Sequence, residues 1–197
     1  MKFKRFNAYM IDILLVGIIL LVLKNIVPIK QNKELNQNMM EITEQFLNKE
    51  ISISEYYNEF SVTNYNQDRN NVILLGFNTL IVIFYFIIIP IITKGYTLGM
   101  YITGIKYEGQ INIKNLFLRN IITTGILQMI VSLILVYLVN NKIYLTISLF
   151  LGIIQLLLVI ISAFMISYRK DLKGIQDIIS NINIIEVKEW KNIQNKN

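Results

Sequence analysis

Residues 71–93 read NVILLGFNTLIVIFYFIIIPIIT, a run of 23 residues that contains no charged side chain. A helix rises 1.5 Å per residue, so this run is long enough to cross a hydrocarbon core of about 30 Å. Pro90 lacks the N–H donor and its ring clashes with the preceding turn, so it should kink or end the helix. The segment predicts a membrane-spanning helix.

Three other apolar stretches accompany this segment, at residues 6–27, 120–141 and 143–168. The last two are uncharged and separated by a very short turn, which indicates a transmembrane helical hairpin. The first could be a cleavable signal peptide, but Asp12 interrupts its apolar region and no small-residue cleavage site follows it. We therefore expect an all-α membrane protein with four spans, forming one membrane domain over residues 1–197.

The composition supports a membrane protein and excludes several kinds of catalytic site. Of the 197 residues, 54% are hydrophobic and 16% are charged, which is typical of membrane proteins. The chain has no cysteine and no histidine, so thiolate nucleophiles, Cys-ligated metals and His-based triads or metal sites are excluded. No nucleophile paired with a base is visible, and we expect neither an enzyme nor a cofactor.

The orientation follows from the basic residues next to the spans. Three lie before the first span, four lie in 94–119 and six lie from 169 onward, whereas 29–70 carries four basic residues against seven acidic ones. This distribution predicts that both termini and the loop 94–119 are cytoplasmic and that the loop 28–70 is extracytoplasmic.

The outer loop 28–70 shows helical periodicity. Its apolar residues recur at helical spacing at Leu35, Met39, Ile42 and Phe46, and Ser54 begins a second stretch that resembles a capped helix. We expect a small helical cap here. A flexible acidic loop is the alternative, because the segment is rich in Asn and Glu.

The two cytoplasmic segments have different patterns. Residues 95–114 carry four glycines and, in their second half, alternate apolar and polar residues, which predicts a β-hairpin or short strand pair at the membrane surface. In the tail 169–197, isoleucines recur at threes and fours beside basic residues, which predicts an amphipathic segment in the lipid interface.

Asp12 lies about two turns inside the first predicted span, where a carboxylate costs roughly 2.5–3.5 kcal/mol. Arg5 is on the same helix face but about 10 Å away along the axis, so direct pairing with Asp12 is not expected. Asp177 in the tail is the better partner for Arg5, and Arg119 could serve either carboxylate. We predict a polar cluster of these four residues at the inner membrane face.

Four stretches resemble the RDD family of bacterial membrane proteins: RFNAYMID at 5–12, KGYTLGMYITGIKYEG at 94–109, LFLRN around Arg119 and LKGIQDII around Asp177. The family is named for one arginine and two aspartates, which map onto Arg5, Asp12 and Asp177. Family members usually carry histidine before the last aspartate, where this chain has Gln176. The resemblance implies a bacterial plasma membrane protein that transports an unidentified ligand, with sodium/proton antiport proposed for some members.

Two functions stay open on this evidence. The first is transport of a monovalent cation or small solute, with Na⁺/H⁺ exchange as one form, by an oligomer that uses the Arg/Asp cluster. The second is a non-transporting scaffold or accessory subunit that binds partner proteins, in which the same cluster is a structural clamp. The lipid bilayer is a partner in either case. Nucleic acid is not expected, because the basic tail is ordinary flanking sequence of a span.

Overall fold

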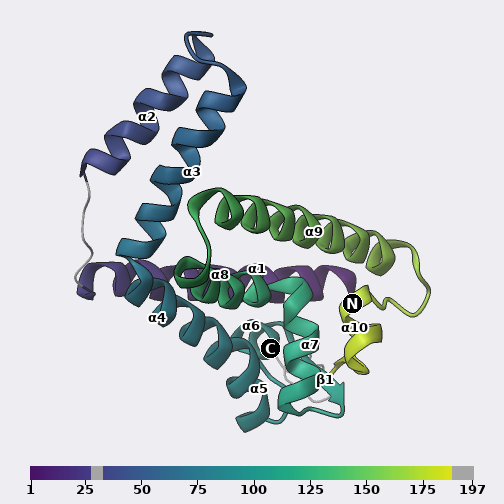
Figure 1. The fold of residues 1–197 in the computed structure, drawn as a ribbon. Helices are drawn as coiled ribbons and strands as arrows, with labels where there is room; N and C mark the ends of the chain where they lie inside the picture. Colours follow the sequence, from purple (N-terminus) through teal and green to yellow (C-terminus); the bar gives the residue numbers. More distant parts are fainter. Residues whose placement is uncertain (28–32, 188–197) are drawn as a thin grey trace. The chain divides into compact units, whose positions relative to one another are not determined.

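The computed structural model describes residues 1–27 and 33–187, which form two compact units. Unit one contains residues 1–23, 80–126 and the described residues from 154 onward. Unit two contains the described residues of 24–79 together with residues 127–153. Most of the described chain is helical, and a two-stranded sheet lies in unit one (Figure 1).

Three helical segments are long and apolar enough to cross a membrane: α1 (Lys2–Ile26), the segment Val72–Ile92, and α9 (Asn141–Tyr168). They coincide with the stretches predicted at 6–27, 71–93 and 143–168. Large apolar side chains on them are exposed, such as Leu14, Leu80 and Phe150. Exposed apolar surface of this extent is expected where lipid, not water, surrounds a helix.

A fourth candidate span consists of α7 (Ile113–Thr123) and α8 (Ile126–Leu138), which bend by 87° at the break between them. The span predicted at 120–141 is therefore not one continuous helix, because residues 120–123 belong to α7 and residues 126–138 form α8. Gly125 adopts a left-handed backbone with φ of +71°, a conformation that commonly ends an α-helix. The described chain thus has three candidate spans, or four if the bent pair counts as one.

Pro90 lies in a segment, Val72–Ile92, whose helix is interrupted just before the proline. The segment divides into α4 (Val72–Ile83), the π-helical turn η1 (Phe84–Ile88) and α5 (Ile89–Ile92). Because proline has no N–H, the carbonyl of Phe86 loses its helical donor four residues later. The side-chain amide of Asn120 on α7 donates to that carbonyl at 2.9 Å. The proline thereby creates a polar contact between η1 and α7.

The strand predicted within 95–114 exists, but its predicted partner is wrong. Residues Leu98–Thr103 form the short helix α6, and β1 (Ile105–Gly109) follows. β1 pairs antiparallel with β2 (Ile182–Glu186) in the tail, with Ile105 opposite Glu186 and Gly109 opposite Ile182. Ile105 and Ile182 are fully buried. The alternating pattern marked a half-buried strand and carried no information about which strand pairs with it.

The isoleucines predicted to form one amphipathic segment in the tail are divided between a helix and a strand. Helix α10 covers only Ile175–Ser180 and ends at Asn181, whose φ is 52°. The chain then continues as β2, so the isoleucines at 182 and 185 belong to a strand instead of a helix face. The predicted tail from residue 188 onward lies outside the described residues.

Unit two contains the predicted helical pair, α2 (Lys33–Leu47) and α3 (Ile53–Asn70), which lie side by side in Figure 1. The N-cap of α3 is Ser52 and not the predicted Ser54. The Ser52 hydroxyl accepts from the N–H of Glu55 at 3.3 Å, and the Glu55 carboxylate accepts from the N–H of Ser52 at 2.8 Å. This reciprocal capping box fixes the start of the helix.

Hydrogen bonds join α3 to α8 and α9 in unit two. Tyr144 on α9 donates to Asp68 at 2.7 Å, and Tyr65 donates to the carbonyl of Val136 at 3.0 Å. Asn141 donates to the Ser61 hydroxyl at 2.8 Å. The helical pair is therefore attached to the apolar segments through buried polar contacts and not only through the chain.

Candidate functional site

An aspartate between two arginines connects three helices of unit one. Asp177 on α10 accepts from Arg5 on α1, with Nη2 at 2.5 Å from Oδ2, and its Oδ1 accepts from Nη1 of Arg119 on α7. The three side chains are only 8%, 1% and 5% exposed for Arg5, Asp177 and Arg119. The expected pairing of Arg5 with Asp177 is therefore present. We call these residues the arginine–aspartate cluster.

The turn that begins α10 holds Asp177 in place. The N–H of Gly174 donates to Oδ2 of Asp177 at 2.9 Å, and Arg5 also donates to the carbonyl of Leu172. A Cβ atom at Gly174 would lie 2.6 Å from Oε1 of Gln176 and would collide with the Ser162 hydroxyl. The turn therefore has no space for a side chain at residue 174.

The arginine–aspartate cluster carries one surplus positive charge, because two guanidiniums meet one carboxylate. Burial raises the pKa of Asp177, but Arg119 and Arg5 lower it by more, so the pKa of this carboxyl lies below its ordinary value. The carboxyl is therefore ionised at neutral pH. The Tyr107 ring lies under the Arg119 guanidinium, 4.7 Å from its central carbon, and a cation–π contact stabilises that charge.

Asp12 has a different environment from Asp177. It is 3% exposed and accepts three hydrogen bonds, from the Tyr85 hydroxyl at 2.5 Å, the Thr97 hydroxyl at 2.6 Å and the Gly99 N–H at 2.7 Å. No Lys or Arg forms an ion pair with it among the described residues. The predicted cluster of four thus separates into the arginine–aspartate cluster and an Asp12 site built from neutral donors.

The three donors to Asp12 were missed from the sequence because they are uncharged. Tyr85 lies within an apolar span, and the backbone N–H of Gly99 has no side-chain signature. The glycine spacing of residues 95–104 was the one sequence feature that could have indicated a close approach of this segment to another helix. A Cβ atom at Gly99 would lie 2.8 Å from Oδ1 of Asp12 and closer still to the carbonyl oxygen of Ala8. A glycine here permits α6 to approach α1 closely.

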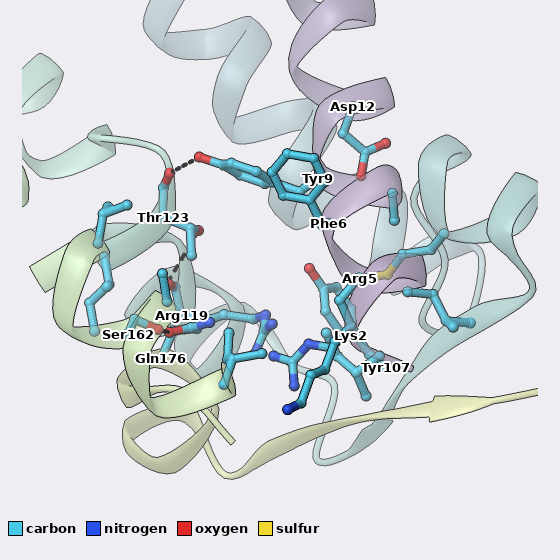
Figure 2. A pocket seen from close by; sticks show the side chains of 18 of the residues that line it. Lys2, Arg5, Phe6, Tyr9, Asp12, Tyr107, Arg119, Thr123, Ser162 and Gln176 are labelled. Atoms are coloured by element: carbon cyan, nitrogen blue, oxygen red, sulfur yellow. Dashed lines mark hydrogen bonds between the residues drawn. The ribbon is translucent and has the colours of Figure 1, made fainter. Parts of the chain in front are cut away.

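A cavity of about 520 Å³ in unit one is lined by Asp12 and by both arginines of the arginine–aspartate cluster (Figure 2). Its wall includes Lys2, Arg5, Asp12 and Arg119, and most of the remaining surface is apolar. The apolar lining includes Phe3, Phe6, Phe86, Ile122, Val159 and Ile166. The volume lies in the range of about 300–1,000 Å³ that is usual for small-molecule sites.

Gln176 also lines the cavity. It occupies the position before Asp177, where members of the family that the sequence resembles usually have histidine. It is 5% exposed, and its side-chain carbonyl accepts from the hydroxyl of Ser162 on α9. A glutamine does not titrate, so this position holds α9 against α10 without proton transfer. No group of three or more His, Cys, Asp or Glu residues that could hold a metal ion occurs in the described parts of the chain.

Comparison with known proteins identifies a family but no individual relative. A sequence model of the RDD family matches residues 2–181, which includes all four residues of the predicted cluster. No curated protein matches the chain significantly. No solved structure matches it significantly either.

Proposed function

Because the chain belongs to the RDD family of membrane proteins, we propose that it transports a monovalent cation or small solute and that the Asp12 carboxylate is the group that takes up the cation or a proton. Exchange of Na⁺ for H⁺ is one form of this activity. The observation that carries the proposal is the bonding of Asp12. A buried carboxylate that meets only neutral donors can exchange a proton or a cation without displacing an arginine.

The arginine–aspartate cluster supports this assignment by contrast. Asp177 is paired with two guanidiniums, so a cation would have to displace a buried arginine to reach it. Breaking a buried ion pair costs about 3–5 kcal/mol. We therefore assign the cluster to holding α1, α7 and α10 together. We assign the exchange step to Asp12, which lines the same cavity as Arg5 and Arg119.

Asp12→Asn is expected to abolish cation-dependent proton flux. Asparagine has nearly the same size as aspartate but cannot ionise. Its amide nitrogen is a donor and would replace a carboxylate oxygen that accepts hydrogen bonds. The measurement uses purified protein in liposomes that contain a pH-sensitive dye, with imposed sodium, potassium or no added cation gradient. Wild-type protein should change the internal pH in a cation-dependent way, and Asp12→Asn should match empty liposomes.

The control for this experiment is Asp12→Glu, which keeps the charge and should retain part of the flux. Both variants must reach the membrane and remain monodisperse in detergent. Unchanged flux in Asp12→Asn, or wild-type flux equal to that of empty liposomes, would refute the proposed transport.

A second candidate function is a scaffold or accessory subunit that binds a partner protein through α2 and α3. Apolar side chains on and beside this pair are strongly exposed: Met40 is 74% exposed, Leu47 73% and Ile53 75%. Exposed residues of this kind often belong to interaction surfaces. A triple Asp substitution at these positions should release any stoichiometric partner that copurifies from the native membrane. Isolation of the wild-type protein alone would count against this function.

A further inference from the structure

The cavity in unit one has two different ends. In Figure 2, Asp12 lies at one end and Lys2 and Arg5 lie toward the other, with Phe6 between them. Lys2 and Asp12 are ten residues apart on α1, which corresponds to about 15 Å along the helix. Lys2 and Phe6 are exposed, so the basic end is accessible from outside the protein.

The basic end of the cavity has more positive than negative charge. Arg5 and Arg119 contribute two positive charges and Asp177 one negative charge, and Lys2 adds a third positive charge. The Lys2 ammonium donates to the carbonyl of Ser167 at 2.5 Å, which is a neutral acceptor. The surplus positive charge of Arg5 and Arg119 is removed from water and favours an anion beside it, and the exposed Lys2 adds a further attraction.

The rest of the cavity wall is unsuited to a small hydrated anion. It is formed mainly by aromatic and aliphatic side chains, such as Phe86, Ile122, Val159 and Ile166. Such a wall offers few hydrogen bonds to replace the hydration shell of an inorganic ion. It instead gains free energy by covering apolar surface of a ligand, at about 25 cal/mol per Å².

From this combination we propose that the cavity binds an organic monoanion with an apolar chain, with the anionic group next to Lys2 and the chain along the apolar wall. This inference goes beyond the proposed transport and does not depend on cation uptake by Asp12. The shared chemistry is an anionic head attached to an apolar acyl chain. A free fatty acid and an anionic phospholipid both provide it.

The test is equilibrium binding of radiolabelled decanoate to the full-length protein in nanodiscs made of zwitterionic phosphatidylcholine. Binding to empty nanodiscs is subtracted, because decanoate also partitions into lipid. We expect a saturable signal near one decanoate per protein. Unlabelled decanoate should compete fully, whereas decan-1-ol and decyltrimethylammonium, which have the chain without the anion, should compete at least tenfold more weakly.

One pair of variants tests the basic end of the cavity. Lys2→Gln should weaken decanoate binding by roughly two- to fivefold, since an exposed charge contributes modestly, whereas Lys4→Gln should leave it unchanged. Lys4 is two residues away, pairs with Glu186 at 3.6 Å and does not line the cavity.

A second pair of variants on α9 tests the apolar wall. Val159→Phe should weaken decanoate binding at least tenfold by filling the cavity. Leu157→Phe is the control and should leave the affinity unchanged. Leu157 lies on the same helix, is 52% exposed and does not line the cavity.

The outcomes distinguish the proposal from its alternatives. A non-saturable signal, equal competition by decan-1-ol, or identical affinity in Val159→Phe and Leu157→Phe would each overturn it, provided all variants are monodisperse. Nanodiscs that contain phosphatidylglycerol show which class of ligand occupies the cavity. A lowered affinity for decanoate identifies an anionic phospholipid as the occupant, and an unchanged affinity identifies a free acid. Decanoate binding with no cation flux, or flux without binding, separates this inference from the proposed transport.

Discussion

Asp177→Asn is expected to destabilise the protein by about 3–5 kcal/mol, because it leaves two buried guanidiniums without their carboxylate. Asparagine is close in size, so the loss reflects charge and not packing. For a chain of 197 residues, this corresponds to a melting temperature that is roughly 6–20 °C lower. The measurement is thermal unfolding of the purified protein in detergent.

The chain provides a matched control for this variant. Asp171 also pairs with an arginine, Arg169, at 2.8 Å, but these side chains are 42% and 44% exposed. Asp171→Asn should therefore lower the melting temperature much less than Asp177→Asn does, because water screens an exposed ion pair. Equal melting temperatures for the two variants would show that the arginine–aspartate cluster does not stabilise the fold.

Acid should reproduce part of the Asp177→Asn effect in the wild-type protein. The pKa of Asp177 is lower in the folded protein than in the unfolded chain, so its stabilising contribution is complete above its ordinary pKa of about 4. That contribution is lost as the pH falls further through the lowered pKa. Below about pH 4, the wild-type melting temperature should fall more steeply than that of Asp177→Asn. Parallel curves would contradict this linkage.

Gly99→Ala is expected to destabilise unit one by about 1–3 kcal/mol, the usual cost of adding a methyl group where no space exists. The added Cβ would lie 2.8 Å from Oδ1 of Asp12 and would overlap the backbone carbonyl of Ala8. A backbone atom cannot move aside as a flexible side chain can. Helix α6 would therefore have to separate from α1, which would lengthen the Gly99 and Thr97 hydrogen bonds to Asp12.

Gly17→Ala is the control for Gly99→Ala. Gly17 also lies in a helix, α1, but a Cβ atom there would meet no atom within 4 Å. Alanine in a helix is favoured over glycine by up to about 1 kcal/mol, so Gly17→Ala should keep or raise the melting temperature. If Gly99→Ala were as stable as Gly17→Ala, the close approach of α6 to Asp12 would be wrong.

Features that depend on long apolar runs and on charge could be predicted from the sequence. The spans at 6–27, 71–93 and 143–168 follow from the near absence of charge over the length of a bilayer. The pairing of Arg5 with Asp177 follows because Asp12 is too far along the same helix for Arg5 to reach it. A long apolar run must be removed from water and a buried charge must be paired. Few arrangements of the chain satisfy both requirements.

Features that depend on tertiary contacts between uncharged groups could not be predicted. Tyr85, Thr97 and Gly99 donate to Asp12 from segments far away in the sequence, and no local pattern specifies that meeting. The partner of β1 was unpredictable for the same reason, since alternation defines a strand face and not a neighbour. In the tail, isoleucine spacing suggested a helix, but Asn181 in a left-handed conformation ends it after six residues.

The arginine–aspartate cluster has a consequence for biosynthesis. Arg5 is synthesised 172 positions before its carboxylate partner. Arg119 is synthesised 58 positions before the same aspartate. The strand that pairs with β1 follows this aspartate in the chain. During translation both arginines are therefore without this counterion until residue 177 has been added to the chain. A chain that ends before residue 177 would contain every candidate span found in the described residues and would still lack the carboxylate that joins α1, α7 and α10.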